Sequence, residues 1–79
     1  MYYVYILRSE TSLDRYYIGF TEDLKKRLGQ HNAGESIHTN KYLPWRLKTY
    51  TAFDSKKKAQ QFEACLKSGY GRSFVKKHL

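Results

Sequence analysis

A chain of 79 residues with a formal net charge of +8 is long enough for one small basic domain and too short for several. Its single cysteine excludes an internal disulfide, as is typical of a reducing compartment, and no apolar run is long enough to cross a membrane. We therefore expect one domain over residues 1–79, a cytoplasmic location, no membrane partner, and an anionic partner of which nucleic acid is the commonest kind. A basic surface that serves only solubility is the plain alternative.

Two strands joined as a hairpin are predicted at the start of the chain. Residues 2–8 alternate apolar and aromatic side chains on both faces, which indicates a central strand that is covered on both sides. Residues 9–15 are polar and turn-like, and residues 16–20 alternate again. Such a hairpin can place Tyr5 and Tyr17 on one face of the sheet, although the sequence does not fix the register.

A helix is predicted to follow the second strand, with Thr21 as its N-cap and Gly34 near its end. Arg27 and His31 fall on the same face of this helix as two leucines. A charged group on a core-facing stripe must be paired or must line a site. Either residue alone fits a structural role, whereas the two together fit a functional site equally well.

The middle of the chain is predicted to contain a loop over residues 35–44 and a third strand over residues 45–53. The loop is long enough to carry function rather than to serve only as a connection. Regular alternation divides the strand into one face with Trp45, Leu47, Thr49, Thr51 and Phe53 and another with Arg46, Lys48 and Tyr50. The two cations of the second face would extend a basic surface.

A second helix is predicted from Asp54 or Ser55 to about Lys67. Glu63 lies within the apolar stripe of this helix, where a carboxylate needs a partner. It can pair with Arg27 across the edge of the core, or it can bind a hard divalent cation through oxygen, and the residues favour neither interpretation. A last short helix is expected to pack onto the sheet after this one.

Basic residues gather on the predicted helices. Three lysines open the second helix, where they oppose the helix dipole and repel one another. This pattern indicates either attraction of phosphate or a solvated charge run. We expect the nucleic-acid contacts to come from Lys26, Lys56, Lys57, Lys58, Lys67 and Arg72.

A guanidinium, an imidazole and a carboxylate in this arrangement favour phosphodiester hydrolysis. Arg27 has the planar fork that matches phosphate oxygens, and Glu63 has the oxygen ligand that a hard metal ion prefers. The base that deprotonates water can be Tyr5, Tyr17 or His31, and the residues alone do not choose among them.

Five positions in this order resemble the GIY-YIG endonuclease superfamily, and above all its small single-domain branch. The two halves of the family's name motif correspond to Tyr3-Val4-Tyr5 and Tyr17-Ile18-Gly19, and its helical Arg, His and Glu correspond to Arg27, His31 and Glu63. The resemblance implies an α/β (α+β) fold in which a small central sheet of three antiparallel strands is flanked by about three helices, in the order ββαβαα.

The resemblance also implies a DNA endonuclease that uses one Mg²⁺ or Mn²⁺ ion. It assigns Tyr5 as general base, Tyr17 to hydrogen bonding around the attacking water, Arg27 to the scissile phosphate, His31 to proton movement and Glu63 to the metal. Cleavage would be structure-selective or weakly specific, in the setting of DNA repair or recombination, and a protein partner could supply target choice.

Two positions depart from the family pattern. Tyr3 stands where the family has the first glycine of its motif, and no asparagine follows Asn40, although many active members carry one near this end of the domain. Two alternatives therefore stay open. One is a module that binds DNA or RNA and keeps the site with little or no cleavage, and the other is a basic interaction or structural domain.

Overall fold

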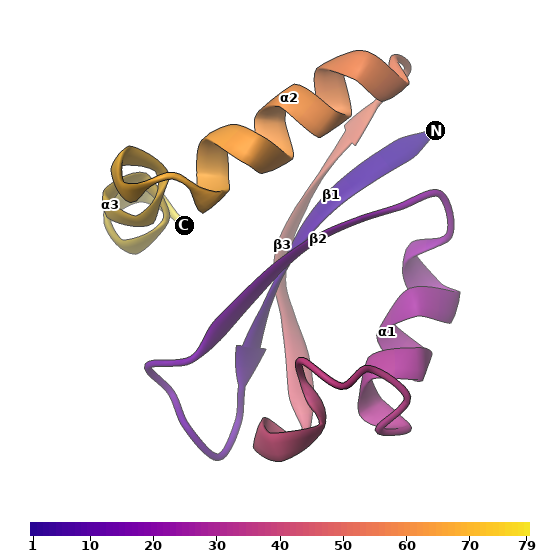
Figure 1. Cartoon of the computed structure of the whole chain (residues 1–79), viewed down its shortest axis with the longest axis vertical. Helices are drawn as coiled ribbons and strands as arrows, with labels where there is room; N and C mark the ends of the chain where they lie inside the picture. The colour runs from indigo at the N-terminus through magenta and orange to yellow at the C-terminus, as the bar shows by residue number, and fades with distance from the viewer.

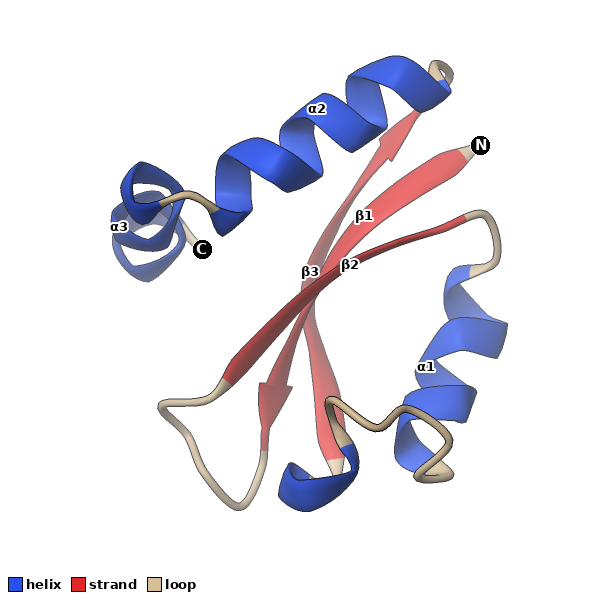
Figure 2. Ribbon diagram, viewed as in Figure 1, coloured by secondary structure: helices blue, strands red, loops and turns tan.

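The computed structural model describes all residues, 1–79, and has an α+β fold of three strands and three α-helices. In chain order the elements are β1 (Tyr2–Ser9), β2 (Tyr16–Thr21), α1 (Leu24–Asn32), the 3₁₀ turn η1 (Asn40–Tyr42), β3 (Trp45–Phe53), α2 (Lys56–Lys67) and α3 (Gly69–His78). This order confirms the predicted ββαβαα fold (Figure 2). None of the helices has the length and apolarity that crossing a bilayer requires.

β1 is the central strand of the sheet, as its two apolar faces predict. The strand order is β2-β1-β3, and both neighbours run antiparallel to β1. Figure 1 shows α1 on one side of the twisted sheet and α2 with α3 on the other. Tyr5 pairs with Gly19, and Leu7 pairs with Tyr17, so that both tyrosines lie on the α1 side and the predicted shared face is confirmed.

Two hydrophobic clusters hold the layers together. On the α2 side, two residues of β1 pack with three from the C-terminal helices: Val4, Ile6, Ala59, Leu66 and Val75. On the α1 side the buried members are Tyr5, Leu7 and Trp45. Tyr5 is therefore a residue of the close-packed core, and its position is fixed by its neighbours.

A β-bulge in β3 shows that the predicted division of this strand into two faces is wrong. The register with β1 slips at Lys48, which is an extra residue without a partner on the neighbouring strand. Trp45 and Leu47 pack on the α1 side, whereas Phe53, which regular alternation places beside them, packs on the α2 side. Tyr50 accordingly lies on the α1 side. One inserted residue reverses the alternation of every later residue in the strand.

The helix ends agree with the predictions except at the start of α1. Asp23, not Thr21, is the N-cap of α1, and its carboxylate accepts a hydrogen bond from the Lys26 amide at 3.0 Å. The Thr21 hydroxyl accepts instead from the Asp23 amide, in a turn just before the helix. Gly34 follows the end of α1 with a φ of 76°, a conformation that favours glycine, and Ser55 caps α2.

α3 lies directly against the end of α2 because Gly71 has no side chain. A Cβ at this position would overlap the backbone of Cys65 and Leu66. Between the two helices, Ser68 caps α3 by accepting a hydrogen bond from the Gly71 amide at 3.1 Å. This contact holds α3 over the α2 side of the sheet.

Candidate active site

His31 lies at the centre of a buried hydrogen-bonded array on the α1 side of the sheet. Its side chain has no exposed surface. The hydroxyl of Tyr5 lies 2.8 Å from Nε2 of His31, and the hydroxyl of Thr39 lies 2.8 Å from Nδ1. Both ring nitrogens are therefore engaged, and the orientation of the imidazole is fixed from β1 on one side and from the loop before β3 on the other.

Gly19 makes room for the Tyr5 phenol. The two residues are partners across β1 and β2, and the Tyr5 side chain crosses the backbone of Gly19. A Cβ on Gly19 would overlap the Tyr5 hydroxyl and its ring. The phenolic oxygen of Tyr5 can therefore take this position only because residue 19 is a glycine.

Arg27 reaches the same oxygen from α1. Its Nε donates a hydrogen bond to the Tyr5 hydroxyl oxygen at 3.3 Å, and its Nη1 donates to Oε1 of Gln30 at 3.1 Å. The hydrogen bond with Tyr5 raises the pKa of Arg27, which stays charged. The guanidinium is partly exposed and has further N–H donors that these two bonds do not use, so it can also hold an anion.

Tyr17 completes the cluster by ring packing. Its ring centroid lies 4.9 Å from that of His31 and 6.3 Å from that of Tyr5. Tyr17 remains partly exposed, whereas Tyr5 and His31 are buried. The cluster therefore opens to solvent at Tyr17 and Arg27.

Burial keeps Tyr5 protonated and His31 neutral. Burial raises the pKa of Tyr5 above its ordinary value of 10.0, even though the hydrogen bond from Arg27 opposes this, so the phenol keeps its proton near neutral pH. Burial, aided by the charge of Arg27, lowers the pKa of His31 from 6.5 to about 4, so the imidazole is neutral. The neutral ring carries one N–H. In the tautomer with this N–H on Nδ1, the ring donates to Thr39, and Nε2 accepts the Tyr5 proton while Arg27 donates to the Tyr5 oxygen.

Thr39 is the site residue that the sequence did not identify. It is fully buried, and its backbone oxygen accepts a hydrogen bond from the indole Nε1 of Trp45 at 2.7 Å. This bond anchors the loop that brings the hydroxyl to His31. The length of the loop was the only signal in the sequence that it carried function.

Glu63 comes from α2, in the layer on the opposite side of the sheet. Its side chain is 22% exposed, and its carboxylate forms an ion pair with Nζ of Lys67 at 3.1 Å. Of the two interpretations of Glu63 that the sequence left open, the pairing with Arg27 is therefore not made. The negative charge of Glu63 nevertheless helps to raise the pKa of Tyr5, which places the carboxylate within electrostatic range of the cluster.

The donor set fits a hard cation that takes most of its ligands from water and substrate. No group of three or more His, Cys, Asp or Glu side chains is placed to enclose a metal ion. Mg²⁺ is commonly held by one or two carboxylates together with phosphate oxygens and water, and a single partly exposed carboxylate such as that of Glu63 suits that mode. Glu63, whose charge acts on Tyr5, is the carboxylate that can serve as this ligand.

The residues predicted to contact nucleic acid are spread over three helices rather than gathered in one patch. Lys26 is on α1, four others are on α2 and Arg72 is on α3, all of them exposed. Of these, Lys67 is engaged by Glu63. α1 and the two C-terminal helices cover opposite sides of the sheet (Figure 1), so these cations do not face a single groove.

Known proteins of one family resemble this chain in sequence and in structure. The family profile described as the GIY-YIG catalytic domain matches residues 1–77. Two UPF0213 proteins of Streptococcus pyogenes, one of them from strain Manfredo, are each 44% identical over 72 residues, which is 90% of this chain and 76% of theirs. The solution NMR structure of a UPF0213 protein from Bacillus halodurans is 32% identical, with a TM-score of 0.56, and the match covers 95% of this chain and 82% of that one. The chain therefore belongs to the GIY-YIG catalytic domain family, a nuclease family whose members act on nucleic acid.

Proposed function

We propose that this protein is a metal-dependent endonuclease that hydrolyses phosphodiester bonds, with DNA as the favoured substrate. The observation that carries the proposal is the array in which Arg27, Tyr5, His31 and Thr39 are hydrogen-bonded in sequence. A buried chain of groups that can each pass or hold a proton, open to solvent beside an arginine, suits general-base attack of water on a phosphate.

Proton transfer in the proposed reaction runs from water to His31 through Tyr5. As the water oxygen bonds to phosphorus, a water proton passes to the Tyr5 oxygen and the Tyr5 proton passes to Nε2 of His31. The phosphorus–oxygen bond to the leaving group breaks, and the leaving oxygen keeps the electron pair and takes a proton from solvent. Thr39 continues to accept from Nδ1 and so stabilises the imidazolium that forms.

Substrate binding itself would activate this relay. In the free protein the charge of Arg27 helps to lower the pKa of His31. A phosphate bound to Arg27 offsets that charge, so the pKa of His31 rises and the imidazole becomes a better proton acceptor. Glu63 would hold one Mg²⁺ or Mn²⁺ ion, and the bound ion supplies positive charge for the phosphate oxygens.

The test is nicking of supercoiled plasmid and of branched DNA with Mg²⁺ or Mn²⁺, repeated with chelator and with Glu63→Gln. We expect nicking that requires the metal and is lost in Glu63→Gln, while DNA binding measured by anisotropy is retained. A variant that nicks as fast as the wild type would remove Glu63 from the mechanism.

A nucleic-acid-binding module without efficient cleavage is the second candidate. The ion pair between Glu63 and Lys67 favours it, because that contact occupies the carboxylate that a metal needs. The raised pKa of Tyr5 also opposes its use as a base in the free protein. DNA binding without nicking under any metal condition would establish this function in place of the first.

A further inference from the structure

Two arginines lie side by side on neighbouring strands, on the face of the sheet away from the candidate active site. Arg8 of β1 pairs directly with Arg46 of β3 and, on its other side, with Tyr16 of β2. All three lie on the side of the sheet that α2 and α3 cover. Like charges at directly opposed positions destabilise a sheet, and no acidic side chain forms an ion pair with either arginine.

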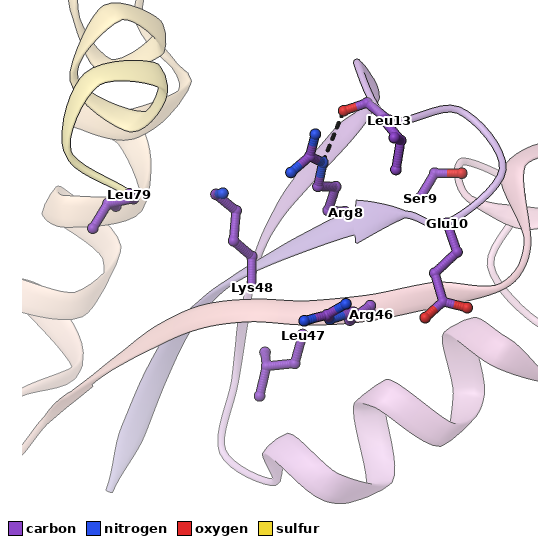
Figure 3. Close-up of a pocket in the computed structure, with 8 residues that line it drawn as sticks. All are labelled: Arg8, Ser9, Glu10, Leu13, Arg46, Leu47, Lys48 and Leu79. Atoms are coloured by element: carbon purple, nitrogen blue, oxygen red, sulfur yellow. Dashed lines mark hydrogen bonds between the residues drawn. The ribbon is translucent and has the colours of Figure 1, made fainter.

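The bulge in β3 adds a third cation to this row. Lys48 is the extra residue, and its Nζ lies 5.8 Å from the ring centroid of Tyr16. Bulges redirect side chains and are common beside functional sites. Figure 3 shows Lys48 extending to the side of the strand where Arg8 lies, whereas the neighbouring Leu47 points the other way.

These three cations line a pocket of about 310 Å³. The Nε of Arg8 donates to the backbone oxygen of Leu13 at 2.9 Å, which fixes the guanidinium and leaves its remaining N–H donors available (Figure 3). The pocket has one acidic side chain, Glu10, against the three cations. The only ion pair in the whole chain is that of Lys67 with Glu63, on α2, so the positive charge of the pocket is not neutralised within the protein.

A second basic hollow, of about 470 Å³, has Tyr16 in its lining. It is lined by Arg15, Arg72 and Lys76, with one acidic residue, Asp14. Tyr16 belongs to the lining of this hollow and contacts Lys48 of the first, so the two hollows adjoin. We call the whole the α3-side basic surface, formed by Arg8, Arg15, Arg46, Lys48, Arg72 and Lys76 around Tyr16.

We propose that the α3-side basic surface binds a single-stranded segment of nucleic acid, and that this site is separate from the candidate active site, where the cleaved nucleic acid would bind. Two adjoining cationic hollows suit the repeated phosphates of a polymer better than one small phosphate compound. Tyr16, which is 40% exposed, lines the second hollow beside Lys48 of the first and offers a ring on which a base can stack. A duplex hides its base faces, whereas a single strand presents them. The proposal rests on the proposed nucleic-acid partner and not on cleavage.

The test measures binding of a ten-nucleotide oligothymidylate in chelator, by anisotropy and by amide chemical shifts of isotope-labelled protein. We expect saturable shifts at Tyr16, Arg46 and Lys48. The double variant Arg46→Gln/Lys48→Gln should bind at least several-fold more weakly and lower the slope of log affinity against log salt by about 1.4, because two phosphate contacts are lost. Its thermal midpoint should equal or exceed that of the wild type, since the repulsion with Arg8 is removed.

The matched control is Lys41→Gln/Lys77→Gln, which removes the same charge from exposed positions outside both hollows. The control should keep the wild-type salt slope. An equal loss of oligothymidylate affinity in both double variants would overturn the proposal, because it would show that binding depends only on the net charge of the protein. Tyr16→Ala should weaken oligothymidylate binding about 5-fold or more and leave duplex binding unchanged. An equal loss for duplex would overturn the single-strand assignment.

Two further outcomes separate this proposal from the proposed function. Shifts confined to the α1 side of the sheet would overturn the single-strand surface and leave the nuclease proposal standing. Shifts at Arg46 with inorganic phosphate but not with oligothymidylate would do the same. If the α3-side basic surface shows shifts with oligothymidylate but the protein never nicks DNA, the proposed nuclease activity is refuted and the proposed single-strand binding is supported.

Discussion

Acid should destabilise this protein through His31. The folded state holds the imidazole neutral, with a pKa of about 4, whereas the unfolded chain takes up a proton below the ordinary pKa of 6.5. Because the unfolded state binds more protons between these values, the free energy of unfolding falls as the pH falls through that range. At about 1.4 kcal/mol for each pKa unit, the full effect is about 3 kcal/mol, a large share of the stability of a small domain.

The assay is urea unfolding of the wild type and of His31→Gln at intervals from pH 7.5 to pH 4.5. Carboxylates contribute to the acid sensitivity of both proteins, so the difference between the two curves isolates the imidazole. We expect the wild type to lose about 2 to 3 kcal/mol more than the variant, with most of that loss below pH 6.5. Parallel curves would refute the buried neutral imidazole, and with it the placement of the protons in the array.

Three substitutions, two of them with a matched control, test the packing of the site and of the C-terminal helices. Gly19→Ala should abolish nicking and destabilise the fold, because the new methyl group occupies the place of the Tyr5 hydroxyl; retained activity with an unchanged midpoint would contradict this. Gly71→Ala should lower the free energy of unfolding by about 1 to 3 kcal/mol, as measured by urea unfolding. Its control, Gly29→Ala, lies at an open helical position and should raise the free energy of unfolding by about 0.5 to 1 kcal/mol. Equal effects of the two substitutions would refute the close contact of α3 with α2. Thr39→Val, compared with Thr39→Ser, should shift the pH profile of nicking, since only serine keeps an acceptor for Nδ1; identical profiles would remove the hydroxyl from the relay.

Much of the fold and part of the site follow from local patterns in the sequence. The spacing of Arg27 and His31 puts both on one helical face, and that face does meet the sheet. Alternation in the first two strands brings Tyr5 and Tyr17 to the same side. These predictions succeed because helical and strand periods fix which side chains share a face.

The predictions fail where geometry depends on distant parts of the chain. The bulge at Lys48 is a feature of pairing between strands, and it reverses the faces of β3 without any mark in the local pattern. Thr39 reaches His31 only because Trp45 holds the intervening loop. The ion-pair partner of Glu63 also depends on how the elements pack. Lys67, one helical turn further along α2, forms the ion pair in place of Arg27.

The most direct test of the central claim is the rate of metal-dependent nicking by Tyr5→Phe beside Tyr50→Phe. Both variants remove one hydroxyl from the α1 side of the sheet, but only Tyr5 is bonded to His31 and Arg27, and Tyr50 is exposed. We predict a loss of about 10² to 10⁴ in rate for Tyr5→Phe, with DNA binding retained, and no loss for Tyr50→Phe. Equal rates for the two variants would contradict the proton relay on which the proposed hydrolysis depends.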